Sequence, residues 1–221
     1  METQNLSIPV ITIDGGAGTG KSTHRAKVAA LLGFNELNSG AFYRALGLTV
    51  ARHECDIHDI ERIVAFARTL PVTFKKDRIF LENIDSTNLI YSDETGKLAS
   101  AIAQIPEVRA SFKVAQLAMR QLPGLVADGR DMGTVFDTPY RFFITTAPEE
   151  SARRRVAQFK NMGIEKSYED VLRDIISRDE SDRDNPANPL RPHSDAKIID
   201  NTHLKADDVV EIIIDTYCAH A

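Results

Sequence analysis

A glycine-rich segment between a strand-like and a helix-like stretch constrains the fold of this chain more than any other feature. Residues 15–23 read GGAGTGKST and fit the pattern G-x-x-x-x-G-K-S/T. Residues 8–13 before it are apolar and rich in β-branched side chains, and apolar residues follow it at helical spacing up to Gly33, a residue type common at helix C-caps. Strand, glycine loop and helix in this order predict a phosphate-binding loop.

The residue types of this loop suit a phosphate. Glycines let backbone N–H groups approach an anion closely, and the following helix N-terminus adds partial positive charge. Lys21 can reach the outer phosphates of a nucleotide, and Ser22 can offer its hydroxyl to a magnesium ion. The alternative is an ordinary glycine-rich turn, but the adjacent lysine and serine favour phosphate binding.

The composition indicates a globular protein with one substantial core. The chain has 221 residues, of which 43% are hydrophobic and 27% charged. Its 27 basic and 32 acidic residues give a net charge of −5, which argues against a surface that binds nucleic acid or a membrane as a whole. Cys55 and Cys218 lie far apart without C-x-x-C spacing, so neither a disulfide framework nor a structural zinc site is supported. No apolar run approaches the roughly 20 residues of a membrane span, and we expect a cytoplasmic protein with reduced thiols.

Further apolar runs extend the strand that precedes the loop. They occupy residues 124–128, 140–145 and 196–200, with helical patterns between them. Short, continuously apolar runs are typical of strands buried on both faces. The sequence therefore predicts an α/β fold with a parallel sheet flanked by helices.

Three further segments either continue the alternation of strands and helices or interrupt it. Residues 72–81, with a polar turn at 75–77, predict a β-hairpin and hence a small insertion. Residues 149–184 are helical and dense in charge, with a turn expected at Met162–Gly163, and such a helical pair could close over bound phosphates. Residues 204–217 predict a helix with one apolar side that packs on the sheet.

Arginines lie where a phosphoryl-transfer enzyme needs fixed positive charge. Arg44 follows a turn expected at residues 38–40, Arg109 lies on a predicted helix, and Arg130 comes just past the strand at 124–128. Ligands of open α/β sheets bind at the carboxyl ends of strands, and a guanidinium there can fork onto a phosphate. Any single arginine is more often a surface ion pair, so the strand-end Arg130 is the strongest of the three candidates.

The remaining charged candidates leave two interpretations open. Asp128 ends an apolar run, where P-loop proteins commonly place a carboxylate that orients magnesium or its waters, and Asp131 is a second candidate. Either can instead cap the next helix or pair with an arginine. Arg178 and Asp182 share one face of a helix and either face a ligand or form an exposed salt bridge. Residues 153–155 are consecutive arginines, so at least one points to solvent.

Together these motifs resemble the bacterial cytidylate kinases, members of the nucleoside monophosphate kinase family. The resemblance covers nearly the whole chain and is carried by SGAFYR at 39–44, LPGLVADGRDMGT at 122–134 and RDESD at 178–182. It implies that ATP and CMP, and also dCMP, react to give ADP and CDP or dCDP, with Mg²⁺ as cofactor. It also implies a monomer with only these small-molecule partners and a single domain in three parts: a core (about 1–37, 111–155 and 184–221), a monophosphate-binding insertion (about 38–110) and a lid (about 156–183).

The resemblance also implies the donor half of the site. The catalytic residues would be Lys21, Asp128, Arg130 and Asp131. Ser22 would hold Mg²⁺ together with phosphates and waters, and the lid would contribute Arg154 and Arg155. The ATP phosphates would lie on Gly15, Gly16, Ala17, Gly18, Thr19, Gly20, Lys21, Ser22 and Thr23.

For the acceptor half, the resemblance implies contacts to each part of CMP. Its phosphate would meet Arg44 and Arg130, and its ribose would meet Arg178 and Asp182. Cytosine would meet Ser100, Arg109 and Asp131, while Ser39 and Tyr43 would help to line the pocket. A carboxylate or hydroxyl can accept from the exocyclic amine of cytosine, and arginine can donate to its ring nitrogen and carbonyl, so these residue types suit that base.

Three positions depart from the family pattern. Gly16 stands where the family usually has proline, and Tyr91 stands where an arginine is common, so an ion pair is expected to be missing there. Asn185 replaces an arginine that often contacts the acceptor phosphate. We expect either that Arg183 or Arg191 compensates, or that CMP binds more weakly.

Two alternatives to a CMP kinase follow from the same residues. One is a kinase for another small acceptor such as UMP or AMP, against which the set of Ser100, Arg109 and Asp131 argues. The other is a non-catalytic, ATP-dependent switch protein, which has no need for acceptor-site arginines such as Arg44 and Arg130.

Overall fold

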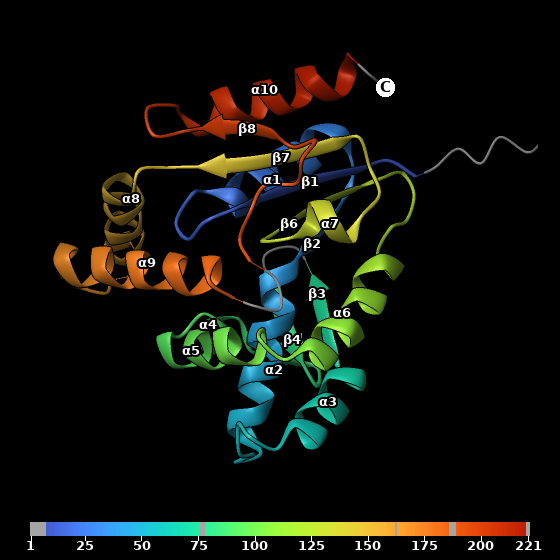
Figure 1. Cartoon of the computed structure of the whole chain (residues 1–221), viewed down its shortest axis with the longest axis vertical. Helices are drawn as coiled ribbons and strands as arrows, with labels where there is room; N and C mark the ends of the chain where they lie inside the picture. The colour runs from blue at the N-terminus through green and yellow to red at the C-terminus, as the bar shows by residue number, and fades with distance from the viewer. Residues whose placement is uncertain (1–7, 76–77, 162, 186–188, 220–221) are drawn as a thin grey trace, which may run out of the picture. The chain divides into compact units, whose positions relative to one another are not determined.

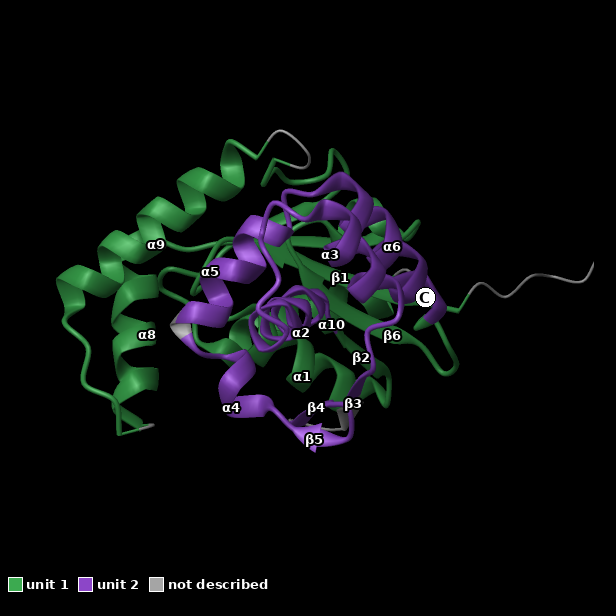
Figure 2. Cartoon of the chain, turned by 90° about the horizontal axis from the view of Figure 1, so that it is seen from below, with its two compact units in different colours: residues 1–37, 119–221 green, residues 38–118 purple. Residues whose placement is uncertain are grey.

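The computed structural model describes residues 8–75, 78–161, 163–185 and 189–219. The chain forms two compact units, which Figure 2 shows in different colours. Unit 1 comprises Met1–Leu37 and Met119–Ala221, and unit 2 comprises Asn38–Ala118. Within the described part of the chain, no helix combines the length and the apolar character that a membrane span requires.

A five-stranded sheet forms the centre of unit 1 (Figure 1). Its strand order is β2-β6-β1-β7-β8, and β1 runs parallel to both of its neighbours, as β7 does to β8. This confirms the predicted parallel sheet and the four strands expected in it, while β2 was not expected. The strands are β1 (Val10–Gly15), β2 (Asn35–Asn38), β6 (Leu125–Gly129), β7 (Tyr140–Thr145) and β8 (Lys197–Asp200).

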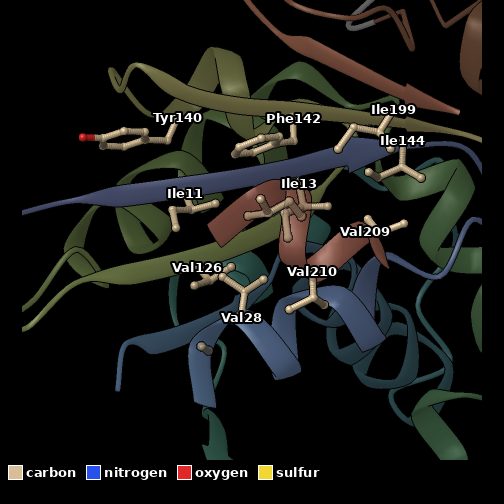
Figure 3. Close-up of a cluster of buried hydrophobic side chains, with 12 residues drawn as sticks. Ile11, Ile13, Val28, Val126, Tyr140, Phe142, Ile144, Ile199, Val209 and Val210 are labelled. Atoms are coloured by element: carbon tan, nitrogen blue, oxygen red, sulfur yellow. The ribbon is translucent and has the colours of Figure 1, made fainter. Parts of the chain in front are cut away.

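A hydrophobic core of unit 1 lies between this sheet and two helices, as Figure 3 shows. Ile11 and Ile13 of β1 pack with Val28 of α1 (Lys21–Leu32) and with Val209 and Val210 of α10 (Ala206–Cys218). Because side chains alternate along a strand, Thr12 and Asp14 point to the other face of the sheet. The short helix α7 (Met132–Val135) contacts β1. The helices predicted after the glycine loop and at the end of the chain are confirmed.

The charged segment after β7 forms the helical pair that the sequence predicts. Helices α8 (Pro148–Asn161) and α9 (Tyr168–Arg183) share a small apolar cluster around Ala152, Val171 and Ile175. The expected turn is longer than two residues, because α9 begins only where the Ser167 hydroxyl accepts a hydrogen bond from the Asp170 N–H at 3.1 Å. Gly163 has a φ of +73°, and Met162 lies outside the described residues.

Unit 2 contains the predicted hairpin within a mixed helical and sheet structure. Strands β3 (Val72–Lys75), β4 (Arg78–Leu81) and β5 (Ile84–Asp85) form an antiparallel sheet in that order, so the hairpin is confirmed and has a third strand that was not expected. Residues 76 and 77 of the expected turn lie outside the described residues. The core joins α2 to β4 and includes Ala45, Leu48, Ile79, Leu81 and Ile90. The helices are α2 (Ser39–Arg52), α3 (Ile60–Arg68), α4 (Thr87–Ile90), α5 (Asp93–Ile102) and α6 (Pro106–Ala118).

The turn expected at residues 38–40 is wrong. Asn38 is the N-cap of α2, and its side-chain oxygen accepts a hydrogen bond from the Ala41 N–H at 3.2 Å. Asparagine is common both in turns and at N-caps, which is why the local pattern was ambiguous. Ser39 therefore opens a helix that also carries Tyr43 and Arg44.

Candidate active site

The glycine loop between β1 and α1 has a backbone that only glycine adopts without strain. Gly18 and Gly20 have φ values of +71° and +83°. Gly15 lies so close to β7 that an added Cβ would be 2.2 Å from the Ile144 carbonyl oxygen. The loop shape thus depends on glycine at positions that also fit the phosphate-loop pattern.

Lys21 turns back onto this loop. Its ammonium donates to the Gly16 carbonyl oxygen and, at 3.2 Å, to the Thr19 hydroxyl. Burial, followed by the nearby guanidinium of Arg130, lowers the pKa of Lys21 to about 7. A phosphate in the loop would supply the negative charge that favours the ammonium form.

Helix α9 places a carboxylate directly on the loop. The Ala17 N–H donates to Asp179 Oδ1 at 2.8 Å. An added Cβ at Gly16 would lie 2.7 Å from Asp179 Oδ2, so the absence of a side chain at position 16 permits this close contact. A carboxylate oxygen of the chain itself therefore accepts from one of the loop N–H donors.

Arg130 joins the loop to α9. Its guanidinium donates to the Gly15 carbonyl oxygen at 2.9 Å and forms ion pairs with Asp182 at 2.5 Å and Asp179 at 3.5 Å. Arg178 lies 3.9 Å from the same Asp182 carboxylate. The structure thus brings Arg130 to Arg178 and Asp182, which the sequence had placed together on a different segment.

Ser22 and Asp128 meet at the carboxyl end of β6. The Ser22 hydroxyl donates to Asp128 Oδ2 at 3.0 Å, and Arg25 Nη1 lies 2.5 Å from Asp128 Oδ1. No group of three or more His, Cys, Asp or Glu side chains that could hold a metal ion occurs among the residues the structure describes. The hydroxyl and the carboxylate nevertheless fit Mg²⁺, which prefers oxygen ligands and usually takes most of them from waters and substrate phosphates.

Asp131 lies at the N-cap position of α7, but its side chain makes no capping hydrogen bond. Asp14 caps this helix instead, because its carboxylate accepts hydrogen bonds from the N–H groups of Met132 at 2.9 Å and Gly133 at 2.7 Å. Burial raises the pKa of Asp14 to about 7, although these two hydrogen bonds oppose the rise. Asp14 therefore fixes the segment that carries Arg130 and Asp131.

Arg154 and Arg155 differ in their surroundings on α8. Arg154 Nη2 donates to the Asn201 carbonyl oxygen at 2.8 Å, and its Nε donates to Glu150 at 3.1 Å. Asn201 Nδ2 in turn donates to the Thr19 carbonyl oxygen of the loop at 2.9 Å. Arg155 lies 4.7 Å over the Phe159 ring. Arg154 is thus connected to the loop through Asn201, whereas the ring under Arg155 belongs to its own helix, α8.

Arg153 confirms the expectation that one of the three consecutive arginines points to solvent, since its side chain is 65% exposed. It pairs with Glu150, one turn earlier, at 3.0 Å. Consecutive positions on a helix differ by about 100° in direction, so these arginines cannot share one environment.

Unit 2 holds the other predicted acceptor residues. Arg44 Nη1 donates to the Ile90 carbonyl oxygen at 3.0 Å, and its guanidinium lies 5.6 Å over the Tyr91 ring. Gly96 lets the same guanidinium approach α5, because an added Cβ would lie 3.1 Å from Arg44 Nη2. Ser100 donates to the Gly96 carbonyl oxygen at 3.1 Å. Arg44 and Ser100 thus contact the same part of α5.

Aromatic rings position the remaining acceptor candidates of unit 2. Tyr43 packs edge-on against Phe112 with ring centroids 5.0 Å apart, and Arg109 lies 6.0 Å over the Tyr43 ring. Arg109 Nη1 also donates to the Ala103 carbonyl oxygen at 3.3 Å. The Ser39 hydroxyl accepts from Gln116 at 3.0 Å. The structure therefore brings Tyr43 and Arg109 together, and Gln116 of the same helix, α6, holds Ser39.

A model of the family described as cytidylate kinase matches residues 11–219 of this chain. The chain belongs to the cytidylate kinase family. This confirms the resemblance that the sequence motifs indicated.

Named relatives cover nearly the full length of the chain. A cytidylate kinase from Paraburkholderia xenovorans is 43% identical over 211 residues, which are 95% of this chain and 92% of that protein. Another from Methylococcus capsulatus is 41% identical over 219 residues, 97% and 99% of the two chains. A solved structure of an uncharacterized protein from Eubacterium ventriosum has a TM-score of 0.52 at 12% identity and covers 96% of this chain and 99% of that one, a similarity of fold alone.

Two of the departures from the cytidylate kinase pattern can be placed in the structure. Tyr91 contacts Arg44 through its ring, as described above, so a cation–π contact stands at the position where an ion pair was expected to be missing. Arg183 and Arg191, the candidates to compensate for Asn185, are both exposed.

Sequence reasoning missed three residues of this site. Asp179 lies in the RDESD segment, but no role was predicted for it. Asp14 directly precedes the loop, and Arg25 lies three residues after Ser22 on the same helix. Helical spacing alone could have placed Arg25 beside Ser22. The contacts of Asp14 and Asp179 join segments separated by 118 and 162 residues, so no local signal pointed to them.

Proposed function

We propose that this chain transfers the γ-phosphoryl group of ATP to CMP, and to dCMP, giving ADP and the corresponding diphosphate. It is a phosphotransferase of the cytidylate kinase family, whose members act in pyrimidine nucleotide metabolism. The observation that carries the proposal is the cluster in unit 1, where Lys21 lies in a phosphate loop that Arg130 contacts directly. Arg130 in turn is paired with Asp182.

The reaction needs no nucleophile from the protein. An oxygen of the CMP phosphate attacks the γ-phosphorus in line, and the bond from that phosphorus to the β–γ bridging oxygen breaks. Lys21 and Arg130 would neutralise charge that develops on the transferred group, and the loop N–H groups would fix the β-phosphate. Exclusion of water matters because water could otherwise take the phosphoryl group.

Acceptor binding would use the residues that the family resemblance implies. Arg44 and Arg130 would bind the CMP phosphate, and Arg178 and Asp182 the ribose. The cytosine contacts assigned above to Ser100, Arg109 and Asp131 remain part of the proposal, as do Ser39 and Tyr43 in the pocket wall and the lid role of Arg154 and Arg155. Arginine is suited to these roles because its planar guanidinium binds an oxyanion through two parallel hydrogen bonds.

Ser22 and Asp128 would hold Mg²⁺ together with donor phosphates and waters. When bound, Mg²⁺ would neutralise charge on those phosphates. The division into core, insertion from about residue 38 to 110 and lid from about 156 to 183, a monomeric state and a cytoplasmic location belong to the same proposal. Two unpaired cysteines among the described residues support a reducing compartment.

An acceptor-specificity assay tests the proposal. Purified protein receives magnesium and ATP with CMP, dCMP, UMP or AMP, and ADP formation is followed. We expect turnover with CMP and dCMP and much slower turnover with the other two. Faster turnover with UMP or AMP than with CMP would mean that this other nucleotide is the acceptor. Absence of turnover with every nucleotide would favour a switch protein. Lys21→Ala should abolish the activity, whereas Lys27→Ala on the exposed side of the same helix should retain it.

A further inference from the structure

Arg25 is a largely buried cation beside the Ser22–Asp128 pair. Its side chain is 13% exposed and that of Asp128 is 5% exposed, and Nη1 lies 2.5 Å from Asp128 Oδ1. The other carboxylate oxygen of Asp128, Oδ2, accepts from the Ser22 hydroxyl. Both oxygens of Asp128 therefore have a fixed partner.

A second carboxylate fixes Arg25 itself. Arg25 Nε lies 2.9 Å from Glu36 Oε2, and Glu36 belongs to the edge strand β2. Because guanidinium N–H donors lie in one plane, two carboxylates at Nε and Nη1 define the orientation of that plane. Ser22 and Arg25 are three residues apart on α1 and so lie on one face of the helix.

This arrangement controls the direction of a single hydroxyl proton. Ser22 has one proton to donate, and donation to Asp128 leaves its oxygen lone pairs available to a cation. Without Arg25, the buried Asp128 carboxylate would lose its ion pair and, among the described residues, keep the Ser22 hydroxyl as its hydrogen-bond partner, which is costly for a charged group. It would then turn, and the Ser22 proton would lose its fixed acceptor.

We propose that Arg25 is a positioning residue of the donor site, which acts through Asp128 to orient the Ser22 hydroxyl toward a divalent cation bound with nucleotide. The proposal deepens the proposed function and rests on it for the presence of a metal–nucleotide complex. It predicts that loss of Arg25 weakens binding of the metal more than binding of the nucleotide. A purely structural ion pair would instead change only the stability of the fold.

Metal binding to the enzyme–ADP complex separates these two roles. Mn²⁺ is titrated into the complex and free Mn²⁺ is measured by electron paramagnetic resonance, while the Kd of metal-free ADP is measured by calorimetry. In Arg25→Met we expect the Mn²⁺ affinity to fall about tenfold or more, as is typical when a residue that orients a metal ligand is lost. The Kd of metal-free ADP should change less than about twofold, within the scatter expected for a residue that does not contact nucleotide.

Three further variants make the result decisive. Arg25→Lys should recover part of the Mn²⁺ affinity, because it restores the charge but not the planar fork. Lys27→Met is the matched control and should leave both affinities unchanged. Lys27 lies on the exposed side of α1 and pairs with Asp207 of α10. Adding Arg25→Met to Ser22→Ala should cause no further loss of Mn²⁺ affinity, because Arg25 acts through that hydroxyl.

Wild-type Mn²⁺ affinity in Arg25→Met, with only a lowered melting temperature, would overturn the proposal. If Arg25→Met does not fold, Glu36→Gln tests the same point, because it removes one anchor of Arg25 and keeps the pair with Asp128. A smaller loss of Mn²⁺ affinity in that variant supports the proposal, and none contradicts it. Absence of CMP-dependent turnover in the wild type would overturn the proposed function, whereas the Mn²⁺ and ADP measurements would still decide the role of Arg25.

Discussion

Lys21 carries a charge that depends on what fills the loop around it. Burial and the nearby Arg130 lower the pKa of Lys21 to about 7, and loop oxygens accept its hydrogen bonds. Phosphate oxygens would reverse this balance, because an adjacent negative charge favours the ammonium form. Nucleotide binding and protonation of Lys21 are therefore coupled.

We predict that ATP binding at pH 8 takes up protons. With a pKa of about 7, Lys21 is about 90% neutral at pH 8, and the bound phosphates return it to the charged form, so uptake approaches about 0.9 proton. Between pH 7 and 10.5, an unfolded chain holds more protons on Lys21 than the folded protein does. The contribution of Lys21 therefore lowers the free energy of unfolding progressively as the pH falls through that range. Binding enthalpies measured at pH 8 in buffers of different ionisation enthalpy give the proton number. Lys21→Met should show no such uptake, and equal uptake in both proteins would contradict the assignment.

Arg183 and Arg191 are the residues expected to compensate for Asn185. Each flanks Asn185 in sequence and is exposed. If one of them binds the acceptor phosphate, its replacement by alanine should raise the KM for CMP about tenfold, as expected when one charge-assisted hydrogen bond is lost. Steady-state kinetics with varied CMP test this. Arg173→Ala is the control, because Arg173 is exposed and lies on the same helix as Arg183. Unchanged CMP kinetics in both variants would count against compensation.

Among the secondary-structure elements, α9 has the most direct effect on the loop. Its Asp179 accepts a hydrogen bond from the Ala17 N–H, a donor that a phosphate-binding loop directs at its ligand. If the phosphates of ATP bind this loop as proposed, they would compete with the carboxylate for the same N–H group. Asp179 would then have to turn away for a phosphate to enter.

We predict that Asp179→Ala binds ADP more tightly than the wild type. Removal of one competing charge-assisted hydrogen bond should strengthen binding about tenfold, or ~1.4 kcal/mol. Calorimetry with ADP gives the affinity, and Asp174→Ala, at an exposed position of α9, is the matched control. Weaker binding in Asp179→Ala would mean that the carboxylate supports the nucleotide instead of competing with it.

The elements differ in how well the sequence predicted them. Strand β1 is buried along its whole length because parallel neighbours and helices cover it, and its short run of β-branched residues is easy to recognise. Strand β2 reads NELN, with only Leu37 buried, and a polar edge strand of this kind has no distinct pattern. The loop and Asp128 follow from local motifs, whereas the pair of Arg25 with Asp128 joins residues 103 positions apart and depends on the tertiary fold.

At the scale of the whole molecule, the two cysteines differ in burial and therefore in expected reactivity. Cys55 is buried in unit 2, and burial raises the pKa of its thiol, while Cys218 is exposed at the end of α10. A thiol that is both buried and protonated reacts slowly, because the thiolate is the nucleophile.

We therefore predict that one thiol of the native protein reacts rapidly with a disulfide reagent and the other only after denaturation. Colour released by dithionitrobenzoate gives the thiol count in each state. Cys218→Ser should abolish the rapid phase, and Cys55→Ser should preserve it. A rapid phase that persists in Cys218→Ser would show that unit 2 opens readily around Cys55.

The division of the chain affects the order in which its parts can fold during synthesis. Unit 2 is continuous in sequence, whereas unit 1 is interrupted by it. Val10 of the central strand β1 pairs with Leu125, and Ile11 pairs with Tyr140, so β1 has neither neighbour until the whole of unit 2 has left the ribosome. The first strand to be translated is thus among the last to be paired, and in the meantime its apolar residues are available to chaperones or to other nascent chains.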